Sequence, residues 1–365
     1  MFDTIYSITQ WIRDSRGERV SEMQKTRQHA EREISTPVSL CDSKGNLNPA
    51  AIGFARQPII ESNLTGHFMR KKKWNYWCVY GEDILFSATI SHLDYAAVCF
   101  VYFLDYETQR FFEKTITIPL GQRVHMPNQV LETIKFSNNE MSIQLLHMQG
   151  ETHMTVTISD FDGDLLHADL HIEHPVNDDS LNVVIPWNRQ MFQYTAKHHT
   201  LPTSGFVKIG DKRYSFNPEE SFAVLDYGRG VWPRSAQWNW GMASRRVGKQ
   251  RIGLNLGGKW TDGTGMTENA VFVDGRMTKI HEDVLFEYDK LDFMKPWRIH
   301  TKFTNDVELT FTPFFQRVAK TNARLVSSTV HQLIGYYNGV ITLEDGTIFA
   351  VTQLLGSTEE HISKW

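Results

Sequence analysis

The chain has 365 residues, of which 41% are apolar, and a formal net charge of −4. This length suggests about two domains of ordinary size, and the apolar content is sufficient for two buried cores, as in a globular protein. The negative net charge provides no field that would attract nucleic acid, so we expect no nucleic-acid partner.

The cysteines and the apolar runs indicate where the protein is found. The three cysteines, Cys41, Cys78 and Cys99, are odd in number and far apart, which favours buried thiols in a reducing compartment. No apolar run is long enough to cross a bilayer, and the first residues lack the pattern of a secretory signal. We therefore expect a cytoplasmic protein without an integral membrane segment.

Residues 1–35 differ in composition from the rest of the chain. Apolar side chains recur there at roughly helical spacing, at Phe2, Ile5, Tyr6, Ile8, Trp11 and Ile12. The acidic residues Asp3 and Asp14 disfavour an anchor on an anionic membrane. We predict a short N-terminal helical leader, either packed on the body of the protein or forming a frayed extension before Met23.

The chain beyond residue 35 has the pattern of short β-strands. Runs with strand composition or a two-residue period occur at 84–90, 96–104, 110–118, 140–147, 153–159, 165–171 and 181–185. Pairs such as Asn138-Asn139 and Asp162-Gly163 separate them, since these residues tolerate the positive φ of tight hairpin turns. Many short antiparallel strands favour closed barrels, because closure removes exposed strand edges.

An internal similarity indicates that this all-β architecture is duplicated. Gly66–Tyr76 aligns without a gap on Gly230–Trp240, with identical Gly, Arg, Trp and Asn residues at four positions. The offset is roughly 160 residues, which is the length of a domain and too long for a solenoid repeat. We predict two tandem antiparallel barrels, over residues 36–200 and 201–365, with Trp74 and Trp238 in equivalent positions.

The segment 226–269 is the densest in residues that suit a binding site. It places four tryptophans among titratable and amide side chains, as in concave sites where apolar walls bind a ligand and a few polar groups orient it. A tryptophan-rich core with charged loops is the alternative. Its clustered glycines favour a site, because they weaken a strand unless close approach or special backbone geometry requires them: Gly253, Gly257, Gly258, Gly263 and Gly265.

The candidate residues of this segment fall into two groups. Acids that could donate a proton are Asp226, Asp262 and Glu268. Ligand-binding candidates are Arg229, Trp232, Trp238, Trp240, Trp260 and Asn269.

Other chemistries find little support. Gly253–Trp260 matches most of a phosphate loop, but Trp260 replaces the required hydroxyl residue and the following turn cannot begin a helix. His167, Asp169 and His171 alternate along one strand, which is also what a half-exposed strand face shows. The sequence contains no G-x-S-x-G nucleophile elbow, so covalent hydrolase chemistry has no support. We expect no metal and no cofactor.

Longer motifs carry a family resemblance. They are Lys72-Lys-Trp-Asn-Tyr-Trp, Asp226-Tyr-Gly-Arg-Gly-Val-Trp-Pro and the glycine-rich Gly253–Asn269, within a likeness that spans nearly everything from residue 39 to the C-terminus. On these residues the chain is identified as a member of the uncharacterised bacterial family called domain of unknown function 2804.

A more distant resemblance concerns the middle of the chain. The hairpin around Gly210-Asp211 that leads into Leu225-Asp226 is similar to the passage joining the two barrels of carotenoid 1,2-hydratase and AttH-like proteins, although Leu225 stands where the hydratase has an aromatic residue. The resemblance implies tandem lipocalin-like (calycin) barrels. It also implies cofactor-free addition of water or cyclisation, begun by protonating an alkene.

Two functions remain open from the sequence. The protein is either a binding module for a lipophilic small molecule, held in a barrel mouth or interdomain cleft with tryptophan walls, or a cofactor-free acid-catalysed hydratase, cyclase or isomerase acting on a lipophilic alkene. Asp226 is the first candidate for the acid, followed by Asp262 and Glu268, with Arg229 as an orienting group.

Overall fold

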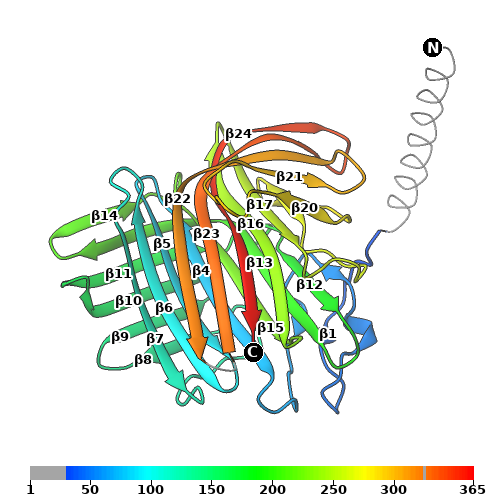
Figure 1. Ribbon diagram of the computed structural model, residues 1–365, viewed down its shortest axis with the longest axis horizontal. Helices are drawn as coiled ribbons and strands as arrows, with labels where there is room; N and C mark the ends of the chain where they lie inside the picture. Colours follow the sequence, from blue (N-terminus) through cyan, green and yellow to red (C-terminus); the bar gives the residue numbers. More distant parts are fainter. Residues whose placement is uncertain (1–29, 324–325) are drawn as a thin grey trace.

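The computed structural model describes residues 30–323 and 326–365. The regular structure of this part of the chain is almost entirely β, in two large curled antiparallel sheets that lie against each other (Figure 1). This confirms the prediction of an all-β fold with two tandem calycin-like barrels. The predicted helical leader falls almost entirely on residues outside the described part. No helix within the described residues is long and apolar enough to cross a membrane.

The first sheet contains most of the strands predicted from the sequence. Its main strand order is β7-β6-β5-β4-β15-β13-β11-β10-β9-β8, and β2, β12 and β14 pair beside this path. The seven runs predicted as strands correspond to β5, β6, β7, β9, β10, β11 and β12. The bounds are β2 (Phe54–Ala55), β4 (Lys71–Tyr80), β5 (Ile84–His92), β6 (Ala96–Asp105), β7 (Phe111–Pro119), β8 (Ile134–Ser137), β9 (Met141–Met148), β10 (Glu151–Phe161), β11 (Asp164–Glu173), β12 (Leu181–Pro186), β13 (Phe192–Ile209), β14 (Lys212–Phe216) and β15 (Phe222–Val231).

The second sheet has the strand order β19-β18-β17-β16-β24-β23-β22-β21-β20. Its bounds are β16 (Ser235–Val247), β17 (Gln250–Gly258), β18 (Ala270–Val273), β19 (Arg276–Lys279), β20 (Val284–Glu287), β21 (Trp297–Thr301), β22 (Val307–Ala323), β23 (Val326–Thr342) and β24 (Ile348–Lys364). A short parallel pair, β1 (Val38–Ser39) with β3 (Ile60–Glu61), and a 3₁₀ turn, η1 (Pro49–Ala51), complete the described elements.

The two strand orders support the internal duplication. In each sheet a first strand is followed by a meander on one side, β4 to β7 and β16 to β19, and is paired on its other side with a late strand, β15 or β24. Trp74 and Trp238 are both the fourth residue of the corresponding strands β4 and β16. The first sheet ends at Val231 and the second begins at Ser235, whereas the boundary expected at residue 200 falls inside β13. We therefore propose Val231–Ser235 as the limit between the units.

Each sheet curls around its own apolar core, and a third apolar layer lies between the sheets. Alternation along β4 sends Trp77 and Val79 into the first core, while Tyr76 and Cys78 turn the opposite way, toward Trp240 of the second sheet. The three cysteines are free and buried, as expected. The contact layer between the sheets is the part of the fold that creates a site.

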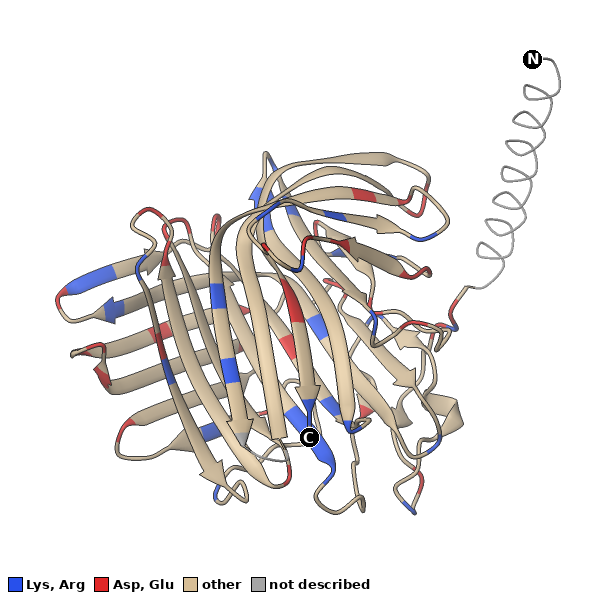
Figure 2. Cartoon of the chain, in the orientation of Figure 1, with Lys and Arg blue, Asp and Glu red and all other residues tan. Residues whose placement is uncertain are grey.

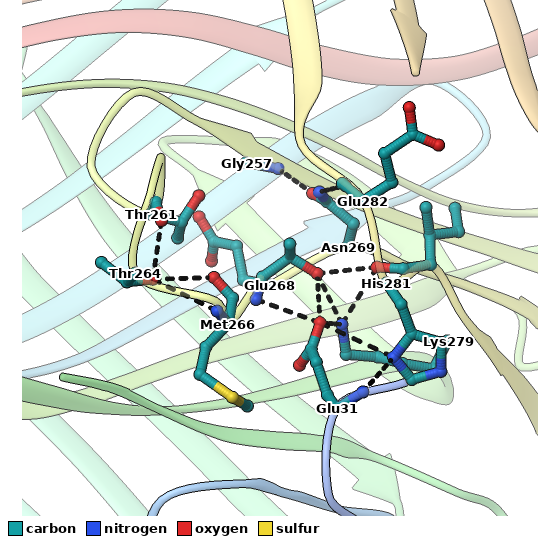
Figure 3. Close-up of polar contacts among 12 residues, drawn as sticks. Glu31, Gly257, Thr261, Thr264, Met266, Glu268, Asn269, Lys279, His281 and Glu282 are labelled. Carbon is teal, nitrogen blue, oxygen red and sulfur yellow. Dashed lines mark hydrogen bonds and ion pairs between the residues drawn. The ribbon is translucent and has the colours of Figure 1, made fainter. Parts of the chain in front are cut away.

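The chain before β1 ties the two units together. Glu31 Oε1 accepts hydrogen bonds from Lys279 Nζ on β19 at 2.7 Å (Figure 3) and from Thr267 Oγ1, in the loop before β18, at 2.9 Å. Ile34 N, in the same segment, donates to Phe54 O on β2 of the first sheet at 2.7 Å. Figure 2 shows acidic and basic segments interspersed over strands and loops of both units.

Candidate functional site: a tryptophan-lined cavity between the sheets

A cavity of about 640 Å³ lies between the two sheets. Side chains of β4, β5, β6, β7, β13 and β15 from the first sheet and of β16, β22, β23 and β24 from the second line it. Its aromatic walls are Trp74, Tyr76, Tyr95, Phe100, Trp232, Trp238, Trp240, Trp260 and Trp365. The volume falls in the range of small-molecule sites, and walls of this kind bind apolar ligands.

The indole rings form one connected group. Trp232 is central, because its ring centroid lies 5.2 Å from that of Trp260 and 5.4 Å from that of Trp238. Trp74 packs on the same ring at 6.0 Å. Gly228 permits this arrangement, since a Cβ there would lie 2.1 Å from the Trp74 ring. The group is therefore built jointly by β4, β15 and β16 and by the loops that follow β15 and β17.

A buried lysine with two carboxylates forms the polar part of the wall. Lys197 Nζ on β13 lies 2.9 Å from Asp226 Oδ1 and 3.1 Å from Glu268 Oε2. Burial by itself lowers the pKa of Lys197, but the two carboxylates outweigh it, and the pKa is raised. The ammonium also lies 4.4 Å from the centre of the Trp240 ring, a cation–π contact that links the cluster to the aromatic walls.

Glu268 owes its position to a glycine. A Cβ at Gly257 would lie 2.0 Å from Glu268 Oε1, so only glycine leaves room for the carboxyl group. The same oxygen accepts a hydrogen bond from Trp260 Nε1 at 2.6 Å. Burial raises the pKa of Glu268, against the opposing effect of Lys197. The close approach predicted from the glycine cluster is thus present at this position.

Glu359 on β24 carries a carboxyl group with few partners that would stabilise its negative charge. It is 8% exposed, lines the cavity and accepts one hydrogen bond, from Trp238 Nε1 at 3.0 Å. Among the described residues, no lysine, arginine or histidine forms an ion pair with it. Burial raises the pKa of Glu359 to about 7, while the Trp238 hydrogen bond acts in the opposite direction. Near neutral pH about half of such groups carry a proton.

A neutral histidine, His361, lies two residues after Glu359 on the same face of β24. The His361 ring centroid lies 3.9 Å from that of Trp238, and Nε2 lies 2.8 Å from the hydroxyl oxygens of Ser328 and Ser363. Burial lowers the pKa of His361 to about 3, so the imidazole is uncharged at neutral pH. Hence it adds no cation that would ionise Glu359.

The structure brings six of the nine candidate site residues to this cavity. They are Asp226, Glu268, Trp232, Trp238, Trp240 and Trp260. The partners of Asp226 are Lys197 and the Thr195 hydroxyl, whose oxygen lies 3.2 Å from Asp226 Oδ1.

The other three candidates lie outside the cavity. Asp262 is exposed in the turn after β17, where its Oδ1 accepts from Lys259 N at 2.8 Å. Asn269 is structural, since its side chain joins Gly257 N to Glu282 O (Figure 3).

Arg229 faces the first core, whereas Asp226 faces the cavity. Both lie on β15 at an odd spacing, and side chains alternate between the two faces of a strand. It is fully buried, and its guanidinium donates to Trp74 O at 2.8 Å and Asn75 Oδ1 at 2.9 Å.

Several polar residues of the cavity were not identified from the sequence, among them Lys197, Glu359 and Lys72. Lys197 alternates with apolar residues in its strand, which is also the pattern of a half-exposed strand. Glu359 stands in the polar run Ser357–His361 near the end of the chain, which resembles an exposed terminus. Lys72 lies in the basic run 70–73, a pattern typical of a solvated strand entry. No local pattern marks any of them.

The alternating histidine strand lies elsewhere, on the outer face of β10 and β11. His153, Asp169 and His171 offer ligand atoms within 4.8 Å of one another. His153 Nε2 is 2.8 Å from Asp169 Oδ1, and the two imidazole rings stack at 4.4 Å. The alternate residues Leu166, Ala168, Leu170 and Ile172 are fully buried, as the two-residue period predicts.

The chain belongs to a family described as a domain of unknown function (DUF2804), whose model matches residues 31–365. No curated protein matches the sequence. Among solved structures, kievitone hydratase from Nectria haematococca is similar with a TM-score of 0.50 and 7% identity, covering 80% of this chain and 88% of the hydratase. An AttH-type protein from Nitrosomonas europaea has a TM-score of 0.50 and 11% identity, covering 81% of this chain and 93% of that protein. The expected likeness to tandem calycin hydratases and AttH-like proteins is confirmed as a likeness of fold.

Proposed function

We propose that this member of the DUF2804 family binds a lipophilic small molecule in the cavity between its two sheets. The observation that carries the proposal is a space of about 640 Å³ lined by connected indole rings and by buried charged side chains that include the Lys197 cluster. When an apolar ligand covers aromatic surface that is open to a cavity, the burial favours binding by about 25 cal/mol per Å². Within this cluster the Lys197 charge is compensated by Asp226 and Glu268, so the ammonium does not need an anionic ligand.

Binding is tested with Nile red, an uncharged probe whose fluorescence rises in apolar surroundings. We expect saturable binding that is weakened by Trp240→Ala, because this ring forms part of the wall. Trp77→Phe is the control, since Trp77 is buried in the first core, outside the cavity lining. Equal affinity in both variants would contradict the location of the site. Native mass spectrometry of protein from its own host, followed by extraction, would identify a bound molecule.

A second candidate function is acid catalysis on the bound molecule, and the state of Glu359 favours it. A carboxyl group with a pKa near 7 in an apolar wall is a suitable proton donor. Asp226 and Glu268, the acids favoured by the sequence, each lie against Lys197 and fit the role less well. The fold shared with kievitone hydratase is compatible with this candidate.

The chemistry would proceed without a cofactor. The Glu359 O–H donates its proton to one alkene carbon, the other carbon becomes a cation, and the Glu359 carboxylate remains. The faces of Trp238 and Trp240 stabilise that cation. A water molecule then adds to the cation through its oxygen and returns a proton to Glu359, which completes a hydration; loss of a neighbouring proton to the carboxylate instead gives an isomer.

The two functions are separated by Glu359→Gln. An acid catalyst should lose about 10²–10⁴-fold in turnover while retaining ligand affinity. A protein that only binds its ligand would retain affinity and have no turnover to lose. Product formation from the molecule extracted from the host protein, followed by mass spectrometry at fixed times, distinguishes the two outcomes.

A further inference from the structure

Lys72 is a buried cation in the cavity wall that lacks a carboxylate partner. It is 2% exposed and lines the cavity from β4. Its ammonium donates to Leu93 O at 3.2 Å. Asp94, an acid near Lys72, forms its ion pair with Lys71 instead, whose Nζ lies 3.0 Å from Asp94 Oδ2. Within the described residues, no ion pair includes Lys72.

The other buried cations of the cavity wall are neutralised. Lys197 has Asp226 and Glu268, as described above. Arg317 on β22 forms a two-pronged pair with Glu113 of β7, with both N–O distances at 2.9 Å. Lys72 therefore differs from both in having no anion among the described residues.

The surroundings of Lys72 suit a charged head group next to an apolar body. The ammonium lies 4.6 Å from the centre of the Tyr95 ring and 5.4 Å from that of Trp365. Trp365 in turn packs near Trp238, at 6.4 Å between centroids, and Trp238 donates to Glu359. A continuous aromatic path thus leads from Lys72 to the carboxyl group of Glu359.

Burial of an ammonium without a counter-ion is costly, and the two ring faces compensate for only part of that cost. Burial lowers the pKa of Lys72 to about 8, with Arg70 adding to the effect and Asp94 opposing it. Lys72 therefore still carries its charge at neutral pH, where an incoming anion would remove much of the penalty. One ammonium matches a single negative charge better than a doubly charged phosphate.

We propose that the lipophilic ligand is an amphipathic carboxylic acid, whose carboxylate pairs with Lys72 while its apolar body lies along Trp365 and Trp238 toward Glu359. This inference rests on the proposed binding function and specifies its ligand class. The arrangement also keeps the ligand's negative charge at Lys72, away from Asp226 and Glu268. A charge-assisted contact of this kind favours the acid over a neutral analogue by about tenfold to a hundredfold.

The test compares cis-parinaric acid with its methyl ester, two fluorescent probes with the same apolar body, by titration of the full chain near pH 7. We expect the unmodified protein to bind the acid at least tenfold more tightly than the ester. Lys72→Met should bring the two affinities together while the ester affinity is retained. Lys72→Arg keeps the charge and should retain the preference.

Lys73→Met is the matched control. Lys73 is the next residue of β4, also has a pKa lowered to about 8 by burial, and lines a different hollow on the opposite face. We expect the acid preference to remain in this variant. If acid and ester bind equally to the unmodified protein, or if Lys72→Met leaves the preference intact, the anion inference is wrong and the binding function stands. If neither probe binds, the binding function fails and the inference with it.

Discussion

Ionisation of Glu359 should make the folded protein less stable as the pH rises, and Glu359→Gln should remove this effect. The pKa of this carboxyl is raised from 4.5 to about 7 by burial. The contribution of this group to the free energy of unfolding is fully present below its unfolded-state pKa of 4.5. It is lost as the pH rises through 7, because between these pH values the folded state binds more protons than the unfolded state. A shift of this size corresponds to about 3 kcal/mol at 1.36 kcal/mol per unit.

Most of this stabilisation is lost in a pH range that is convenient for unfolding experiments, about 2.5 kcal/mol between about pH 5 and pH 8. We expect Glu359→Gln to resemble the unmodified protein near pH 5 and to exceed its free energy of unfolding by about that amount near pH 8, after subtraction of any pH-independent change. Urea unfolding at both pH values measures this. The difference between the two proteins isolates Glu359, because other titrating groups contribute equally to both.

Trp238→Phe is a second test, because it should strengthen the pH dependence that Glu359→Gln removes. Its indole hydrogen bond lowers the pKa of Glu359, so loss of the bond should raise that pKa further and extend the unstable window above pH 7. A constant difference between Glu359→Gln and the unmodified protein at every pH would refute the reasoning, since it would mean that Glu359 ionises in the folded state as it does in the unfolded state.

Three further predictions concern neighbouring groups. Lys197→Met should lower the free energy of unfolding by about 3–5 kcal/mol, because Asp226 and Glu268 lose their shared counter-ion; a loss below about 1 kcal/mol in urea unfolding would contradict this. Gly257→Ala should cost about 1–3 kcal/mol by displacing the Glu268 carboxyl, and an unchanged melting temperature would argue against the close contact. Arg229→Met should lower the melting temperature but leave Nile red affinity unchanged well below it, whereas weakened binding would return Arg229 to the site.

The sequence by itself determined the fold class and much of the candidate site. Strand periodicity and turn residues are local properties, and they predicted the strands of the first sheet from β5 to β12, except the short β8, with small errors at their ends. The repeated Trp and Asn residues lie at the same positions of the corresponding strands β4 and β16, and the repeated Gly and Arg residues precede those strands. The tryptophans after Asp226 reach one cavity because they are close in sequence and lie on β16 and in the loops that follow β15 and β17.

Only the tertiary structure decided which charged groups face one another. Lys197, Asp226, Glu268 and Glu359 come from four segments of two sheets, and their pairing depends on strand register and on how the sheets pack. Arg229 and Asp226 lie three residues apart but on opposite faces, because side chains alternate along a strand. The pKa of Glu359 depends on burial by residues of both sheets, and burial is a property of the assembled chain that no local pattern encodes.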